Sequence, residues 1–252
     1  MKNVTWSSRF TKQMDAEVLE FSQSLNIDIV LFSSDIKVTI AHVEMLKSCG
    51  HITSTEKKKI IAGLKKVLML AENGKLEWSI DFEDVHMNIE NAFVSIIGDV
   101  GKKIHLGRSR NDLVATDLRL YLRDFIDLYI DQLRDIQFVL ANVAIKHSDS
   151  LFPGFTHMQV AQPVTFGHHL LAWCEMIHRD EIRLINNRES INIMPLGSAA
   201  LSGTSLKLNR TMVATALGFK SISKNSMDAV SDRDFAVEFC FIASMAECIC
   251  HV

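Results

Sequence analysis

One long stretch without helix-breaking residues most constrains what this chain can fold into. Between Arg108 and Phe152 there is neither glycine nor proline. Apolar residues recur there at spacings of three and four, which is one face of a helix, namely Leu118, Leu122, Phe125, Tyr129, Leu133, Ile136, Leu140 and Val143. Further apolar residues lie off this stripe, as expected of a helix buried among others: Leu120, Ile126, Leu128, Ile130 and Val139.

This helix is too long for a small globule to bury. From Asp112 to His147 it would extend on the order of 54 Å at about 1.5 Å per residue. A chain of 252 residues has little room for such a helix, whereas a bundle shared between subunits would bury it. The segments Val164 to Asn187 and Asp232 to the last residue have the same character.

The N-terminal part predicts shorter helices with recognisable ends. The first runs from Asp28 to Cys49 and is stopped by Gly50. Thr53 to Glu56 is a capping box that starts a helix running to Gly74, with a lysine-rich solvated face. A third helix runs from Asp84 to Ile97 and ends at Gly98. We therefore predict a mainly α fold, with a small helical N-terminal domain at 1–103 and part of a long-helix bundle domain at 104–252, incomplete at its C-terminus.

Composition excludes several classes of partner. Lys+Arg 27 against Asp+Glu 30 leaves a net charge of −3, so a nucleic-acid partner is not expected. Neither a secretory signal nor an apolar segment of the roughly 18 residues that a membrane span needs occurs, so we expect a cytoplasmic protein without membrane contact. The five cysteines are irregularly spaced and predict buried free thiols. Cys248 to His251 lacks a second ligand pair, so no metal is predicted there.

Polar residues precede the long helix in the stretch His105-Leu-Gly-Arg-Ser-Arg-Asn-Asp112. Ser, Asn and Asp are favoured N-caps, and the first turn of a helix offers unpaired N–H groups and a partial positive charge. Two guanidinium groups beside such an end make a receptor for carboxylate or phosphate. By itself the stretch is read equally well as a capped helix with solvated arginines.

Two other polar blocks separate the helices. Pro153 to Pro163 is expected to form a compact turn holding Thr156 and His157. His157 is a candidate acid–base group because its unperturbed pKa lies near neutrality, although a lone histidine is more often a local hydrogen-bonding residue. The last block combines Pro195–Thr204, whose small residues permit close backbone approach, with Asn225–Asp234, in which Asp232 and Asp234 are read as N-cap and first-turn acids.

Four motifs in this order and spacing resemble argininosuccinate lyase, a branch of the fumarase/aspartase superfamily. They are GRSRND, PGFTHMQVAQPV, PLGSAALSGT and NSMDAVSDRDF. Upstream, Trp6 to Phe10 resembles the family's W-x-x-R-F opening, and the segments Ser24–Asp28 and Glu83–His86 also stand where family blocks stand. The resemblance covers the whole chain.

The resemblance implies a fold, a reaction and a site. The family cleaves argininosuccinate to arginine and fumarate by β-elimination, with no metal and no organic cofactor, and it is a homotetramer whose active sites draw on three subunits. The implied catalytic residue is His157. The implied substrate-binding residues are Ser24, Ser109, Arg110, Asn111 and Thr156, with His86 as a further candidate.

The sequence also departs from the family pattern. Leu106 replaces a common Thr, and Leu113 replaces the Gln that usually follows RSRND. Nothing matches the family's third active-site block, the loop G-S-S-x-M-P-x-K-x-N-P. We therefore expect a fragment of a longer enzyme, inactive alone. The alternative is a non-catalytic helical scaffold, like the relatives that serve as lens structural proteins.

Overall fold

The computed structural model describes residues 15–249, which are mainly α-helical, as the sequence predicts. Trp6–Phe10, Cys250 and His251, which the sequence singled out, lie outside the described residues. The described part divides into two compact units, one comprising residues up to Tyr121 together with Met194–Ser231, the other comprising Leu122–Ile193 and the residues from Asp232 on. The first unit thus extends past the domain boundary expected near Lys103, and an independent domain at 1–103 stays a prediction.

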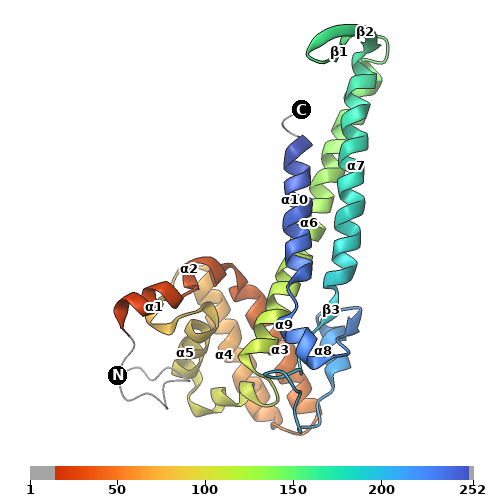
Figure 1. The fold of residues 1–252 in the computed structure, drawn as a ribbon. Helices are drawn as coiled ribbons and strands as arrows, with labels where there is room; N and C mark the ends of the chain where they lie inside the picture. The colour runs from red at the N-terminus through yellow and green to blue at the C-terminus, as the bar shows by residue number, and fades with distance from the viewer. Residues whose placement is uncertain (1–14, 250–252) are drawn as a thin grey trace. The chain divides into compact units, whose positions relative to one another are not determined.

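The first unit is built from short helices around one hydrophobic core (Figure 1). Its elements are α1 (Ala16–Ser22), α2 (Leu25–Asp28), η2 (Ile29–Leu31), α3 (Phe32–Ser48), α4 (Ser54–Glu72), η3 (Ile80–Phe82), α5 (Val85–Ile97), η4 (Asp99–His105), the start of α6 (Arg110–Lys146), α8 (Arg210–Ala216), β4 (Ser221–Ile222) and α9 (Ser226–Ser231). Helices α3, α4 and α5 pack on one another, and α8 packs on α3. Fully buried side chains at their contacts include Ile36, Leu46, Ile60, Leu64 and Phe93.

The helix ends in this unit follow the predicted signals. Thr53 and Glu56 form the capping box, with each side chain bonded to the other residue's backbone N–H. Asp84 caps α5 by accepting from the Met87 N–H at 2.6 Å. Gly98 ends α5 at φ +75°, a conformation that favours glycine. One detail differs: the segment predicted as one helix from Asp28 is divided into α2, η2 and α3.

The second unit consists of long helices and one hairpin. It holds the rest of α6, β1 (Leu151–Thr156), β2 (Gln159–Thr165), α7 (Phe166–Ile191) and α10 (Asp234–Ile249). β3 (Ile193–Met194) connects it to the first unit in sequence and pairs with β4. The long helix predicted from Asp112 to His147 is confirmed as the 37 residues of α6. Figure 1 shows α7 running beside α6 and α10, with the hairpin at one end of α7.

The polar block between Pro153 and Pro163 is not a turn but an antiparallel hairpin. Pro153 stands opposite Pro163, and the register shifts between Pro153 and Phe155. Proline is tolerated in such a two-stranded ribbon because each strand has an edge that needs no N–H donor. The sequence reading missed the strands because their prolines and glycine conceal the alternating pattern.

The last features of the fold are the burial of the cysteines and the hydrophobicity of the helices. Cys49, Cys174 and Cys240 are free thiols, as predicted, but Cys240 is exposed and the other two are half-buried, so their predicted burial is wrong. Within residues 15–249, none of the helices combines the length and the apolar character that a membrane crossing would require.

Candidate functional site

The start of α6 is capped as the sequence predicts. The Ser109 Oγ lies 3.5 Å from the Asn111 N–H, and the Asp112 carboxylate accepts the Ser109 N–H at 2.8 Å. The Asn111 side chain is exposed and donates from Nδ2 to the Ala200 carbonyl at 2.9 Å. Ser109 and Asn111 therefore lie beside the Pro195–Thr204 block. Two motifs that are far apart in the sequence thus meet at the start of α6.

The two arginines of this stretch have different surroundings. Arg108 is buried, and its Nη1 donates to the Thr39 Oγ1 at 2.9 Å. Arg108 is therefore neither a solvated arginine nor a directly accessible receptor for an anion. Arg110 keeps 29% of its side chain exposed and forms ion pairs with Asp84 at 3.6 Å and Glu90 at 3.7 Å. Arg110 is therefore the arginine with surface left for a ligand.

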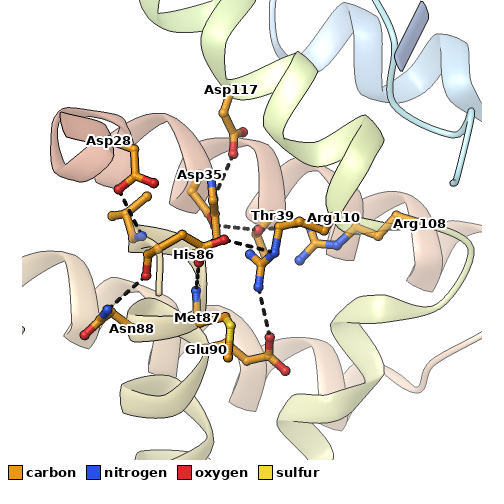
Figure 2. Close-up of polar contacts among 12 residues, drawn as sticks. Asp28, Asp35, Thr39, His86, Met87, Asn88, Glu90, Arg108, Arg110 and Asp117 are labelled. Atoms are coloured by element: carbon orange, nitrogen blue, oxygen red, sulfur yellow. Dashed lines mark hydrogen bonds and ion pairs between the residues drawn. The ribbon is translucent and has the colours of Figure 1, made fainter. Parts of the chain in front are cut away.

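His86 belongs to a buried charged network between α3, α5 and α6 (Figure 2). Its Nδ1 lies 2.6 Å from the Asp35 Oδ2 and 3.5 Å from the Asp117 Oδ2. Asp35 also accepts from the Thr39 Oγ1 at 3.1 Å, and Thr39 in turn accepts from Arg108. The network thereby connects the predicted GRSRND motif with the predicted Glu83–His86 block.

The two carboxylates of this network differ in charge state. Burial raises the pKa of Asp35, but the hydrogen bond and charge of His86 outweigh it, together with Arg108 and Arg110, so its pKa lies below the ordinary value. Burial and the neighbouring Asp35 charge raise the pKa of Asp117 well above its ordinary value. Neither oxygen of Asp117 has a hydrogen-bond partner among the described residues. Asp35 is thus the ionised member, and Asp117 is the one that favours a proton.

The same three side chains are the one group of potential metal ligands in the described part of the chain. Their ligand atoms lie within 4.8 Å of one another. His86 Nδ1 is already engaged by Asp35, however, and the buried Arg108 guanidinium supplies positive charge to both acids. The adjoining cavity, between Asp35, His86 and Arg110, has a volume of about 10 Å³, room for roughly one water. We therefore assign these residues to an internal charge network.

Ser24 precedes α5 in the sequence and Arg110 follows it, and both contact the residues at the start of α5. Ser24 donates its Oγ to Asp28 at 2.5 Å, and its N–H to the Glu83 carbonyl at 2.9 Å. Asp28 accepts the Val85 N–H at 3.1 Å. Because Arg110 pairs with Asp84, the 83–86 segment is flanked by both predicted residues. Ser24, His86, Ser109, Arg110 and Asn111 all belong to the first compact unit.

Thr156 and His157 belong to the second unit, at the tip of the β1–β2 hairpin, and both are exposed. His157 and Met158 are the two turn residues and have φ values of +49° and +62°. Positive φ at both central positions is the geometry of a type I′ turn, which normally favours Asn and Gly. Two bulky residues held there mark a strained turn of the kind that often has a functional reason.

Leu106 and Leu113, which depart from the family pattern, are accommodated by the core. Leu113 is 2% exposed, and Leu106 packs against the same hydrophobic cluster. The Leu106 carbonyl accepts from the Nε2 of buried His42 at 2.9 Å. Burial lowers the pKa of His42 to about 3, so this histidine is a neutral donor.

Sequence reasoning missed Asp35, Thr39 and Asp117. Each is buried in a helix. For Asp35 and Asp117 the available signal was an acid in a helix that also has many apolar residues, because a buried carboxylate needs a partner. Which helices would bring those acids together was not readable from one sequence.

Comparison with known proteins identifies the family of this chain. The sequence pattern of the Lyase family matches residues 8–251. The chain belongs to this lyase family. It is 51% identical over 244 residues to the argininosuccinate lyase of Stutzerimonas stutzeri (strain A1501) and 50% identical to that of Azotobacter vinelandii (strain DJ / ATCC BAA-1303). Each match covers 97% of this chain and 53% of the relative, so this lyase chain spans about half the length of the curated relatives it matches.

Solved structures agree on the fold of the lyase. An EDDS lyase in complex with formate has a TM-score of 0.79 at 31% identity, covering 90% of this chain and 44% of the other. An EDDS lyase variant with bound fumarate has the same TM-score at 30% identity, covering 94% and 47%. A fumarate lyase:delta crystallin from Brucella melitensis, 18% identical with a TM-score of 0.70 over 94% of this chain and 55% of that one, shares the fold. The predicted helical fold of the fumarase/aspartase type is therefore confirmed.

Proposed function

We propose that this chain takes part in the cleavage of argininosuccinate to L-arginine and fumarate, a carbon–nitrogen lyase reaction of arginine biosynthesis. The observation that carries the proposal is the identity of about 50% to argininosuccinate lyases over 97% of the chain. Because the chain spans about half the length of those relatives, the activity is proposed for the whole protein.

The exposed part of the α6 start supports a carboxylate-binding role. Arg110 offers a partly exposed guanidinium at the first turn of a 37-residue helix, whose N–H groups and dipole favour negative charge. Ser109 and Asn111 add a hydroxyl and an amide beside it. The EDDS lyases of the same fold hold formate and fumarate, which are carboxylates. We assign Ser24, Ser109, Arg110, Asn111 and Thr156 to the substrate, which carries three carboxylates and a guanidinium.

His86 has a different part in this proposal. Only 3% of it is exposed, and its Nδ1 is occupied by Asp35. We therefore assign it to positioning the 83–86 segment next to Arg110, in place of direct contact with the substrate.

The proposed chemistry is a β-elimination in which no metal or organic cofactor takes part. A base removes a proton from the carbon beside a carboxylate, and the electron pair forms the new carbon–carbon double bond of fumarate. The carbon–nitrogen bond breaks, and an acid supplies a proton to the departing guanidino nitrogen. His157 is proposed as one of these two groups, exposed on a strained turn. Positively charged and N–H groups around Ser109–Asn111 stabilise the developing negative charge.

Assembly and location extend the proposal. Large apolar side chains of α6 are exposed in the single chain, among them Leu128, Phe138, Val139 and Ile145. Because exposed apolar surface favours association, these side chains support contact between copies, and we propose a homotetramer and a cytoplasmic enzyme that contacts neither membrane nor nucleic acid.

Calorimetry and a fumarate assay on the 252-residue protein test this proposal. We expect argininosuccinate and fumarate to bind, and Arg110→Ala to weaken both by at least tenfold, since it removes the exposed cation. Lys102→Ala, which removes an exposed cation paired with the neighbouring Asp99, is the control. We expect no fumarate release, because the signature loop pattern is not in these residues. Absence of binding at millimolar ligand would overturn the proposal and support the scaffold alternative. The similarity to enzymes argues against that alternative.

A further inference from the structure

We propose that Asp112 is a positioning residue, whose buried carboxylate fixes the Ser109–Asn111 helix start against the Gly197–Ala200 turn. The inference rests on the proposed function, because it takes Ser109 and Asn111 as substrate contacts. It adds that the third motif, PLGSAALSGT, acts on the site through backbone hydrogen bonds to the first.

The Asp112 carboxylate is completely buried and has three backbone donors. Oδ1 accepts the Ser109 N–H at 2.8 Å, which is a local cap of α6. Oδ2 accepts the N–H groups of Gly197 and Ala199, both at 2.8 Å, across more than eighty residues of sequence. One carboxylate therefore joins two segments that the sequence alone had separated into two polar blocks.

The Gly197–Ala199 turn is shaped to present those two N–H groups. Gly197 has φ +91° and Ala199 has φ +52°, and such alternating left-handed conformations turn successive N–H groups toward one anion. The anion here is the protein's own carboxylate. The N–H groups of Gly197 and Ala199 are thereby occupied and do not belong to the substrate's oxygens.

Arg210 holds the same turn from its other side. Its Nε donates to the Leu196 carbonyl at 2.8 Å, and its Nη2 donates to the Ser223 Oγ at 2.8 Å. A Cβ on Gly197 would stand 2.8 Å from the Arg210 Cδ, so the turn and the arginine are closely packed. The turn is therefore a fixed element, and Asp112 transmits its position to the start of α6.

Asn111 shows why this matters for a ligand. Its Nδ2 donates to the Ala200 carbonyl, the residue that follows the Asp112 contacts. The orientation of the Asn111 amide thus depends on the same turn. Loss of the Asp112 bonds would free both Ser109 and Asn111 to leave the arrangement seen here.

The chemistry of the side chain at 112 allows a sharp test. Asparagine has nearly the same shape but carries one oxygen and one NH₂ group. Its NH₂ group would face either the Ser109 N–H or the N–H groups of Gly197 and Ala199, and a donor cannot accept from them. Asp112→Asn must therefore lose either the local cap or the two long-range bonds. Burial raises the pKa of Asp112 while the three N–H donors oppose that rise, which agrees with a carboxylate held in place by its donors.

The first measurement is amide hydrogen exchange by mass spectrometry on the 252-residue protein. We expect Asp112→Ala, which removes both acceptor oxygens, to speed exchange at least tenfold in both peptides 109–113 and 196–201, and Asp112→Asn to speed it in at least one of them. The matched control is Asp15→Ala, because the Asp15 side chain caps α1 by accepting the nearby Glu17 N–H. Acceleration confined to 109–113 in Asp112→Ala would make Asp112 a local helix cap and overturn the proposal.

Another variant keeps the test valid if the Asp112 variants do not fold. Arg210→Lys retains the charge but loses the planar set of donors that holds the turn. We expect faster exchange at 196–201 and, through Asp112, at 109–113. Acceleration at 196–201 alone would show that the two segments are not joined and would overturn the proposal.

The second measurement is fumarate affinity by calorimetry. A positioning role predicts at least tenfold weaker binding for Asp112→Asn, whereas removal of a nearby negative charge alone would strengthen the binding of this dianion. Unchanged or tighter binding would overturn the positioning role. If the unsubstituted protein binds no fumarate, the proposed function fails, and the exchange experiment still decides whether Asp112 joins the two segments.

Discussion

The first compact unit closes its core around a buried charged network, whereas the second leaves large apolar side chains of its longest helix exposed. In the first unit, Asp35, His86, Arg108 and Asp117 are all less than a tenth exposed and lie together beside a closed hydrophobic core. In the second, Phe138 of α6 is 70% exposed and Ile145 is 73% exposed. Apolar side chains are also exposed in the first unit, Phe21 at 92% and Ile27 at 80%, so the contrast lies between the buried network and the α6 face and not between whole units. It indicates that the geometry around Arg110 is determined within the first unit, and we propose that the α6 face serves assembly.

Breaking the buried network should produce the largest effect. Asp35→Ala removes the acceptor of His86 and Thr39 and one of the acids that stabilise the Arg108 charge. Removing one member of a buried charged network costs about 3–5 kcal/mol because the remaining charge stays desolvated. We expect the free energy of unfolding, measured by denaturant titration, to fall by that amount.

The control for Asp35 is an ion pair at the surface. Asp99 pairs with Lys102 at 2.7 Å, but 91% of the Asp99 side chain is exposed. Asp99→Ala should not change the free energy of unfolding measurably, because solvent screens exposed pairs. Equal effects of the two substitutions would contradict the view that the network, rather than charge pairing in general, stabilises the first unit.

Two neighbouring residues of α7 test whether the second unit has a core of its own. Leu184 is fully buried in the single chain, and Ile185 is 39% exposed. Leu184→Ala should lower the free energy of unfolding by about 2–5 kcal/mol through lost burial and the cavity it leaves. Ile185→Ala should remain within about 0.5 kcal/mol in a monomeric sample. A large loss for both would mean that Ile185 is already covered in solution, which chromatography at decreasing concentration would show.

In both units the sequence predicted some features and not others. Helix ends were predictable because Thr53, Asp84 and Gly98 act on residues no more than four positions away. Helix α6 was predictable because its apolar period continues from Leu118 to Val143, about seven turns. The network of Asp35, His86 and Asp117 was not, because it depends on how three helices pack. The strands around His157 were also missed, since two prolines opposite each other conceal the alternation.

The candidate site illustrates the same limit. Its motif residues were identified by resemblance, but which arginine is buried is decided by tertiary contacts of Arg108 with Thr39. Likewise, the residues near Asp112 in the sequence do not predict that Gly197 and Ala199 donate to it. Local chemistry predicts caps and turns, while long-range acceptors require the packed structure.

Charging the apolar face of α6 should change assembly without changing the fold. Phe138→Lys places a charge where we propose that copies meet, and we expect the dissociation constant of self-association to rise at least tenfold, or about 1.4 kcal/mol. Asn91→Lys adds the same charge at an exposed polar position of α5, in the first unit, and is the control. Analytical ultracentrifugation measures both. Identical association of the two variants would rule out Phe138 as part of an interface.

The smallest effect should come from a carboxylate at the surface of the first unit, Glu56. Its hydrogen bond with Lys103, at 2.5 Å, and those with Thr53 lower the pKa of Glu56 from 4.5 to about 2. Because the folded-state pKa lies below the unfolded value, this stabilisation is complete above pH 4.5 and is lost as the pH falls toward about 2. Glu56→Gln should therefore be less stable than the unsubstituted protein at pH 6, and the difference should shrink between pH 4.5 and 2. Thermal unfolding followed by circular dichroism across that range measures it. A difference that stays constant with pH would mean that Glu56 acts through its shape at the helix cap and not through its charge, and the contrast between buried and surface charges would then be one of degree.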